Sequence, residues 1–526
     1  MFWSANYISM RELNFLLKEE NVTLTQILEA DDILQECKAD NNALIRFLTR
    51  PEILAELVTL ITEEPPKDVE LTSQYRHSNI ACEVLTSQLS SLSHRLCMDV
   101  VQMNRLCDFV SRDPPLNPLL ASYFSRTVET LLKRSPKQDC YLHHIVCLRA
   151  LDFFKARRDF LPNLLKHIST SAIADTFKYF ILCLGEPFNK IIMEWLDEHQ
   201  FLENLIQIVC CNYEPEEIQP SPVPIATESQ NDLEKGVCEQ SEKEETNHKD
   251  SDSSADSERE RRTRAVASAN ASELAAELAA GAADPWPASS WCAQQLAARL
   301  RSEPLVRALL QGCFTSAPPL RTPALVGACR VLRALSHSHW YASPLSNSNS
   351  SYVCRRRVGA ARVQVAALVA ELVLSQVEDV GCVAGTAGVL VDMFFAFPEN
   401  NFLHAQVYAL VKNMEQNEWH SDPYWVQLVD EGDLLTRLMD AFERNEGRGG
   451  RVRARAGHMG HVLALCRSLW LAGAALSAPD AVARRWDAFV DQRLQPLLAR
   501  LDAPLGGEYP SETVYEVNIF NIKLSI

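Results

Sequence analysis

The feature that most constrains the fold of this chain is a long succession of short amphipathic segments with apolar residues at helical spacing. Prolines or polar residues separate one segment from the next, and residues 1–211 contain no convincing β-alternation. One such stripe consists of Ile53, Leu54, Leu57, Val58, Leu60 and Ile61. A short amphipathic helix is marginal alone in water, so each helix must cover its apolar face with a neighbour. The sequence therefore predicts an all-α protein.

The length of the chain decides how such helices can be arranged. At 526 residues the chain is too long for one hydrophobic core. Helix pairs of about 40 residues that stack on one another form an α-solenoid of the HEAT or armadillo kind. We therefore expect a HEAT/armadillo-like helical-repeat solenoid in two blocks, joined by a disordered acidic linker.

Local signals indicate where individual helices begin. Thr23 and Gln26 have the spacing of a capping box, in which each side chain bonds a backbone N–H of the first turn. Thr49 stands before Pro51 and Glu52, a pattern that predicts a threonine cap followed by a proline in the first turn and an acid at the positive end of the helix dipole. We therefore expect helices to begin just after Thr23 and just after Thr49.

The negative charge of the chain is concentrated in one segment. Residues 212–260 hold 15 acidic and 4 basic residues, and so carry −11 of the net −17. Such a segment has too little apolar surface to offset the entropy of ordering it, which predicts a disordered linker. The acidic balance also disfavours a general nucleic-acid binder, whose affinity comes from a basic surface.

These shifts in composition divide the chain into four parts. We expect an N-terminal helical-repeat block at 1–211, an acidic disordered linker at 212–265, a C-terminal helical-repeat block at 266–505 and an irregular tail at 506–526. The tail contains a strand-like piece, Val514–Ile522, for which the sequence offers no partner strand.

The cysteines and the apolar runs indicate the cellular compartment in which we expect the protein. The sixteen cysteines are scattered, and no basic region precedes the apolar residues at the N-terminus, so free thiols in a reducing compartment are the simplest interpretation. No stretch reaches the length of uncharged apolar sequence that a membrane span needs. We expect a soluble protein in the cytoplasm, with the nucleus as a further location, and no membrane span.

Motifs that would carry enzyme chemistry are missing from the sequence. The glycines of Gly381–Gly388 have the wrong spacing for a dinucleotide turn, and no phosphate loop or nucleophile elbow occurs. His458 lies between two glycines, which suggests a close backbone approach or a helix start, but it has no identifiable catalytic partner. The arginines at 355–357 and 448–455 form basic patches that are either solvated or meet an acidic partner. We predict no enzyme activity and no cofactor.

One group of residues has the composition of a metal site. Cys140, His143, His144 and Cys147 would share one face of a helix, and thiolate and imidazole are zinc ligands. The alternative is a half-buried helical face, which we favour because structural zinc sites draw ligands from two separate segments of chain. We therefore predict no metal.

Several unusual strings resemble those of a known family. The strings are Met1–Trp3, Leu34–Ala39, Pro115–Ser125, Asn400–His404, Gly457–His461 and Arg485–Trp486 with Phe489. In them the chain resembles the SAPS family, the regulatory subunits of protein phosphatase 6 and its yeast Sit4-type relative. Residues from Asp139 to about Ala150 look like an insertion relative to that family.

The resemblance implies a function. It implies a non-catalytic scaffold that binds the protein phosphatase 6 catalytic subunit, assembles with ankyrin-repeat regulatory subunits, and directs the choice or location of substrates. The alternative is a generic armadillo-like adaptor, in trafficking or transport, without a phosphatase partner. The candidate partner-binding residues lie within the family-like strings: Asn117, Pro118, Tyr123, His404, His458 and His461.

Overall fold

The structure is a computed structural model of the whole chain, and its described residues divide into two compact units. It describes residues 13–19, 21–66, 74–133, 140–182, 184, 186–214, 252–281, 291–336, 358–374, 380–416, 424–446 and 457–503. Within these ranges every regular element is a helix, which confirms the all-α expectation. Contacts group the chain into unit 1, Met1–Ser343, and unit 2, Pro344–Ile526.

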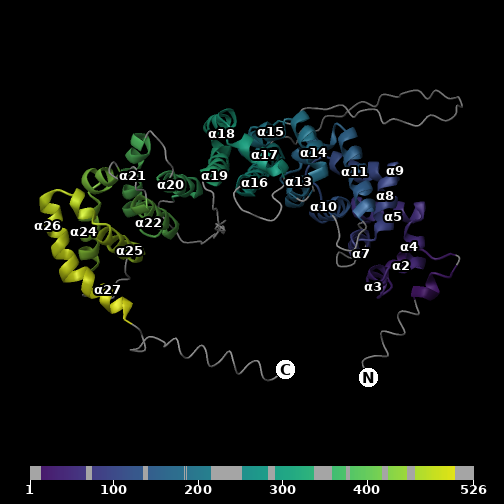
Figure 1. The fold of residues 1–526 in the computed structure, drawn as a ribbon, viewed down its shortest axis with the longest axis horizontal. Helices are drawn as coiled ribbons and strands as arrows, with labels where there is room; N and C mark the ends of the chain where they lie inside the picture. Colours follow the sequence, from purple (N-terminus) through teal and green to yellow (C-terminus); the bar gives the residue numbers. More distant parts are fainter. Residues whose placement is uncertain are drawn as a thin grey trace, which may run out of the picture. The chain divides into compact units, whose positions relative to one another are not determined.

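Unit 1 is a succession of helices (Figure 1). In chain order they are α2 (Leu24–Leu28), α3 (Ile33–Lys38), α4 (Asn42–Leu48), α5 (Pro51–Thr62), α7 (Arg76–Leu85), α8 (Ser90–Met98), α9 (Val100–Asp108), η1 (Phe109–Ser111), α10 (Pro118–Leu132), α11 (Cys140–Ala156), α12 (Phe160–Lys166), α13 (Ser171–Leu182), α14 (Glu186–Glu198), α15 (Phe201–Val209), α16 (Asp252–Gly281), α17 (Trp291–Leu300), α18 (Glu303–Thr315) and α19 (Pro318–Ser336).

The helices of unit 1 stack in successive layers. One series packs in the order α3, α7, α10, α13, α16 and α19, each helix against the next. A second series contains α4, α8 and α11, and farther along the chain α14 packs on α17 and α15 on α18. This arrangement of helix pairs that each cover the next is the expected helical-repeat solenoid.

A buried aromatic cluster holds the middle of unit 1 together. Phe154 of α11 stacks on Phe160 of α12 with ring centroids 4.7 Å apart, and its ring meets Phe180 of α13 edge-on at 5.9 Å. Trp195 of α14 contacts Phe160 and Phe180 at 6.3 and 5.3 Å. Offset and edge-to-face aromatic pairs of this kind stabilise beyond the area they bury. The cluster joins four consecutive helices into one core.

The two predicted helix starts have different outcomes. Thr23 and Gln26 form the capping box at the start of α2, as predicted. Thr49 does not cap α5, because it is the C-cap residue of α4 and its hydroxyl donates to the Ile45 carbonyl of that helix at 2.8 Å. Arg50 takes the cap position without a side-chain bond, and Pro51 is in the first turn as predicted. The prediction for Thr49 was wrong because the two helices are separated by so short a turn.

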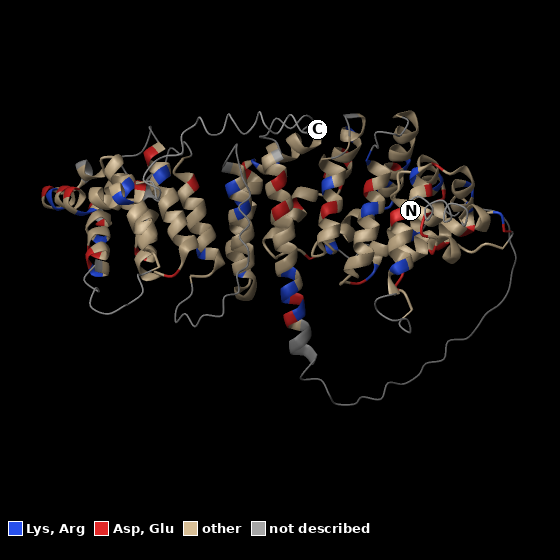
Figure 2. Cartoon of the chain, turned by 90° about the horizontal axis from the view of Figure 1, so that it is seen from below, with Lys and Arg blue, Asp and Glu red and all other residues tan. Residues whose placement is uncertain are grey.

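Helical structure begins inside the segment predicted as linker. Helix α16 starts at Asp252, and its first described turns pair Arg262 with Glu258 and Arg264 with Glu260, one helical turn apart (Figure 2). Farther along, the Ser268 hydroxyl donates to the Val209 carbonyl of α15 at 2.6 Å. Residues 252–336 thus share a core with residues 13–214, and the contacts divide the chain at 343 rather than at 211 and 266. Residues 215–251 lie outside the described residues.

Unit 2 has its own hydrophobic core. Its elements are α20 (Ala360–Leu372), α21 (Val380–Ala396), α22 (Asn401–Gln416), the π-helical η2 (Val426–Glu431), α24 (Leu434–Glu446), α25 (Met459–Leu471), η3 (Ala474–Ser477), α26 (Asp480–Phe489), η4 (Val490–Leu494) and α27 (Gln495–Asp502). Helix α22 packs between α20 and α25, and α24 packs on α25 and α26. Buried Phe394, Leu410, Leu465 and Trp486 belong to one continuous cluster.

Several sequence expectations fall outside the described residues. These are the predicted tail 506–526 with its strand-like piece Val514–Ile522, and the arginines at 355–357, 448, 451, 453 and 455. None of the helices in the described part of the chain combines the length and the apolar composition that a bilayer span requires.

Close helix packing in unit 1 generates a prediction about Gly312 of α18. A Cβ atom at this position would lie 2.6 Å from the Cys210 sulfur at the end of α15. We expect Gly312→Ala to lower the free energy of unfolding of unit 1 by about 1–3 kcal/mol, the cost of overpacking a core. The matched control is Gly460→Ala in α25, where nothing lies within 4 Å of the new methyl group. Urea unfolding of both variants measures the difference, and equal stability would contradict the packing.

Candidate protein-interaction site

The start of α10 is the first place where candidate residues meet. Asn117 caps the helix, because its side-chain oxygen accepts from the backbone N–H groups of Leu119 and Leu120 at 2.9 and 3.3 Å. Pro118 follows in the first turn, where its missing N–H costs nothing. The two residues therefore fix where α10 begins.

Asn117 also ties α10 to two earlier helices, α5 and α7. Its Nδ2 donates to the Tyr75 hydroxyl at 2.7 Å and to Glu64 Oε2 at 3.1 Å. The Tyr75 hydroxyl in turn donates to Glu64 Oε2 at 2.9 Å. Partial burial and the bond to Glu64 raise the pKa of Tyr75. Asn117 thus joins the end of α5, the start of α7 and the start of α10 through three polar side chains.

The remaining residues of this segment differ in their exposure. Tyr123 is buried in the core, and burial raises the pKa of its hydroxyl. Pro118 is exposed, and Leu119 beside it is 48% exposed. The helical spacing of Leu116, Leu119 and Leu120 predicts that Leu119 is buried, and this prediction was wrong, because its side chain stays exposed in the first turn of α10. Pro118 and Leu119 form a small apolar surface that a partner can contact.

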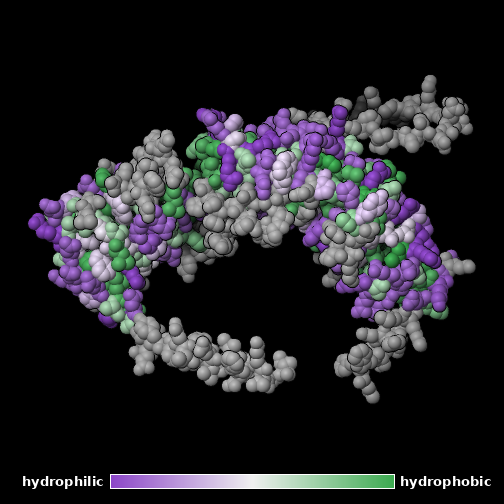
Figure 3. All heavy atoms as spheres, in the orientation of Figure 1, coloured by the Kyte–Doolittle hydropathy of each residue, from purple (hydrophilic) through white to green (hydrophobic). Residues whose placement is uncertain are grey.

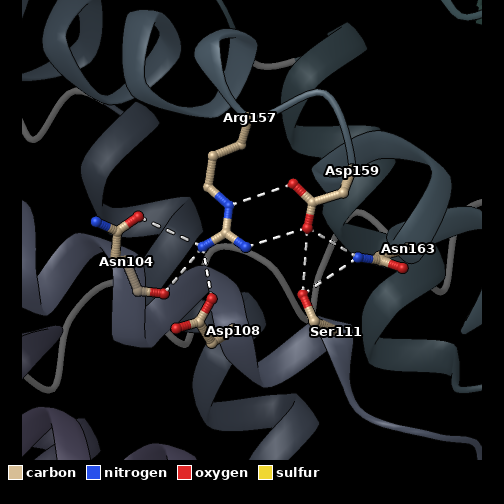
Figure 4. A network of polar contacts seen from close by, with 6 residues as sticks. All are labelled: Asn104, Asp108, Ser111, Arg157, Asp159 and Asn163. Carbon is tan, nitrogen blue, oxygen red and sulfur yellow. Dashed lines mark hydrogen bonds and ion pairs between the residues drawn. The ribbon is translucent and has the colours of Figure 1, made fainter. Parts of the chain in front are cut away.

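A second polar network fixes the corner between α11 and α12 (Figure 4). Arg157 donates to Asp108 at 2.6 Å and to Asp159 at 3.1 Å, and it also reaches the Asn104 carbonyl at 3.3 Å. Asp159 further accepts from Asn163 at 3.3 Å. These bonds hold the turn rigid against α9. Sequence reasoning missed this network, because its members are far apart along the chain and carry no motif.

The three candidate histidines of unit 2 lie close together. The ring of His404 lies 5.8 Å from that of His458 and 5.5 Å from that of His461. His404 is fully buried and His458 is 9% exposed, whereas His461 is half-buried. His404 Nε2 donates to the Phe397 carbonyl at 3.0 Å, which leaves its Nδ1 as a buried lone pair without a partner. His458 Nδ1 is likewise without a partner.

The surroundings keep these histidines neutral. Burial, with smaller contributions from His461 and His458, lowers the pKa of His404 to about 4. Burial also lowers the pKa of His458, with Glu399 opposing and Arg444 adding to the shift, and it lowers the pKa of His461. The structure confirms the expectation of a close backbone approach at Gly457, where a Cβ atom would lie 2.9 Å from the Pro398 carbonyl.

The Cys/His face of α11 holds no metal arrangement. His143 bonds the Leu132 carbonyl at 3.1 Å, and His144 packs against Phe188 at 4.9 Å. Cys147 is buried and Cys140 is exposed, so the four side chains lie in different environments. No group of three or more His, Cys, Asp or Glu side chains in the described ranges is placed to hold a metal ion. From Cys140 onward the suspected insertion lies on α11, with Val146, Cys147 and Ala150 in the core.

Comparison with known proteins gives a family match in both units. The model of the SAPS family, described as SIT4 phosphatase-associated protein, matches residues 145–350 and 382–495, more than half of the chain. No solved structure is significantly similar to the chain.

Curated relatives carry names that agree with this match. Serine/threonine-protein phosphatase 6 regulatory subunit 3-A of Xenopus laevis is 28% identical over 88% of this chain and 54% of its own length. Human regulatory subunit 1 is 27% identical over 89% of this chain and 54% of its own length. Mouse regulatory subunit 2 is 38% identical over 40% of this chain and 22% of its own length. The chain thus spans about half the length of the relatives that it matches broadly.

The capping role of Asn117 generates a stability prediction. We expect Asn117→Ala to lower the free energy of unfolding of unit 1 by about 1 kcal/mol or somewhat more, because the cap and the bond to Tyr75 are both lost. The control is Asn42→Ala, at an exposed position in the first turn of α4. Urea unfolding followed by circular dichroism measures both variants, and an equal effect would contradict the capping role.

The histidine cluster generates a prediction about pH. Folded His404 keeps a pKa of about 4, whereas in the unfolded chain it titrates near the ordinary value of 6.5. Between these two pH values the unfolded chain binds a proton at His404 that the folded chain does not. The contribution of His404 to the stability of unit 2 is therefore complete above about pH 6.5. It is lost as the pH decreases towards about 4, by at most about 3 kcal/mol.

His404→Gln tests the source of this dependence. Glutamine retains an N–H donor for the Phe397 carbonyl but does not titrate. When the pH is lowered from about 7 to about 5, we expect the unfolding midpoint of unit 2 to fall less in this variant than in the wild type. His461→Gln, at the half-buried member of the cluster, serves as the comparison and should change the slope less. An unchanged slope in His404→Gln would show that other groups carry the pH dependence.

Proposed function

Because the chain belongs to the SAPS family of SIT4 phosphatase-associated proteins, we propose that it is a non-catalytic regulatory subunit that binds the catalytic subunit of protein phosphatase 6. The observation that carries the proposal is the family match, which extends through helices of both units. The names of broadly matching relatives, all regulatory subunits of this phosphatase, support it.

The helical stacks suit the role of a scaffold. A stack of helix pairs presents extended surfaces and positions partners through many weak contacts. The proposed mechanism is effective concentration, in which the scaffold holds the phosphatase near its substrates while the catalytic subunit performs the hydrolysis. We extend the proposal to ankyrin-repeat regulatory subunits as further members of the assembly, as the family resemblance implies.

The proposed contact residues divide by exposure. Pro118 is exposed and His461 is half-buried, so both can touch a partner directly. The other four candidates would act by positioning the surfaces beside them: Asn117, Tyr123, His404 and His458. The exposed neighbours Leu119 and Phe402, 48% and 47% exposed, add apolar area at these places. On the face seen in Figure 3, much of unit 1 is hydrophilic and apolar residues reach the surface in separate patches, a pattern that suits localised contacts.

A binding measurement tests the proposal. We expect the full chain to bind purified protein phosphatase 6 catalytic subunit in isothermal titration calorimetry, and to release no phosphate from a phosphopeptide by itself. Leu119→Glu should weaken binding about tenfold or more, because it buries a charge in an apolar contact. Leu310→Glu, on the exposed side of α18, is the matched control and should bind like the wild type.

The outcomes separate two failures. A wild-type chain that does not bind the catalytic subunit would overturn the proposed function. A wild-type chain that binds, together with a Leu119→Glu variant that binds equally well, would overturn only the contact at the start of α10.

A further inference from the structure

A groove of about 820 Å³ runs across three successive helix layers of unit 1. Helices α3 and α4 form one wall, and the second half of α10 forms the other. The end of α7 and the turn into α8 form the floor. Representative lining residues are Lys38, Asn42, Ser87, Ser91, Arg126 and Thr130, and we call this feature the α3–α10 groove. Its volume is in the range of established ligand-binding clefts.

Both walls of the α3–α10 groove carry charges of alternating sign. On the α10 wall, Arg126 pairs with Glu83 at 2.8 Å, and Lys133 pairs with Glu129 at 3.1 Å. On the α3 wall, Lys38 and Asp40 are exposed, and neither forms an ion pair within the described part of the chain. A ligand in the groove therefore meets one unpaired cation and one unpaired anion on the same wall.

The floor of the groove offers hydrogen-bonding groups along its length. Thr86, Ser87, Ser90 and Ser91 line it, and their hydroxyl oxygens can accept hydrogen bonds. Helix α8 begins here without a side-chain cap, and its Leu92 and Ser93 N–H groups donate to the Leu89 carbonyl, so donors for a ligand come from Ser90 and Ser91 in the first turn. The backbone of a bound ligand that carries both hydrogen-bond donors and acceptors would match this floor.

Two residues at the rim have a backbone conformation that is unusual for them. Asp40, after α3, has φ 54°, and Gln88, after α7, has φ 65°. Non-glycine residues avoid this left-handed region, and surrounding structure must hold them there. The two turns thereby hold Asp40 on the α3 wall and Gln88 at the floor of the groove.

We propose that the α3–α10 groove binds an extended peptide segment of a protein partner, one that carries both acidic and basic side chains. The polar floor matches a peptide backbone, and the half-buried Leu34 and Ile45 on the α3 wall accept apolar side chains. Sites for small molecules are mostly apolar with few polar groups, unlike this lining. A nucleic acid is disfavoured by the equal number of acidic and basic side chains in the groove.

This binding place goes beyond the proposed function. The groove is lined by residues between 34 and 133 that include neither Pro118 nor Leu119, the contact proposed for the phosphatase at the start of α10. The peptide site would therefore be a second docking place on the same chain, and its existence does not depend on binding of the phosphatase.

The test uses the full chain and a phage-displayed library of random short peptides. Peptides enriched on the immobilised chain are synthesised with a fluorescent label, and their affinity is measured by fluorescence anisotropy. We expect enriched peptides with acidic and basic residues, and at least about tenfold weaker binding to Thr130→Trp, whose indole fills the groove. Thr315→Trp is the matched control, since both threonines are on helices and donate to the carbonyl four residues earlier, at 2.9 and 3.0 Å.

A charge variant keeps the test decisive if Thr130→Trp does not fold. Lys38→Glu reverses the unpaired cation of the α3 wall, and Lys190→Glu makes the same change at an 84% exposed side chain on α14. We expect weaker peptide binding by Lys38→Glu alone. The proposal is overturned if no peptide is enriched, or if the enriched peptides bind the groove variants as tightly as their controls.

Discussion

The constraint on which this structure depends is that no helix covers its own apolar face. Each helix is short, and its buried residues meet those of the next pair along the stack. Helices α16 and α19 pack closely, and a Cβ atom at Gly327 would lie 3.1 Å from the Ser268 hydroxyl. Small residues at that contact let the two backbones come together. Stability is therefore a property of neighbouring layers, and each unit needs its whole stack.

A stack of this kind places its candidate contact sites at the ends of helices. Asn117, His458 and the floor of the α3–α10 groove lie at helix starts or in the turns beside them. There, backbone groups and polar side chains reach solvent, while the middle of each helix is occupied by packing. Polar bonds such as Asn117 to Tyr75 and Arg157 to Asp108 keep these turns in fixed positions. A scaffold that recognises partners at such turns keeps its binding geometry without a rigid globular core.

Local patterns predicted the features that depend on neighbours in sequence. The capping box at Thr23 and the close approach at Gly457 follow from residue types at short spacing, and both are present. Predictions that needed the tertiary environment were less successful. The hydroxyl of Thr49 is taken by the preceding helix, and Leu119 projects beyond its neighbours. The acidic composition around residue 252 concealed a helix that pairs its own charges and packs against α15.

The sequence by itself determined the all-α class, the stacking of helices and the family, because periodicity, caps and long unusual strings are properties of contiguous residues. Only the tertiary structure decided which residues share a core, which of the candidates reach the surface, and where a groove opens. Those outcomes depend on contacts between residues far apart in the chain, such as Arg157 with Asp108 and His404 with His458. A one-dimensional pattern specifies the face that a helix must bury, but the neighbouring layers decide how completely it is covered.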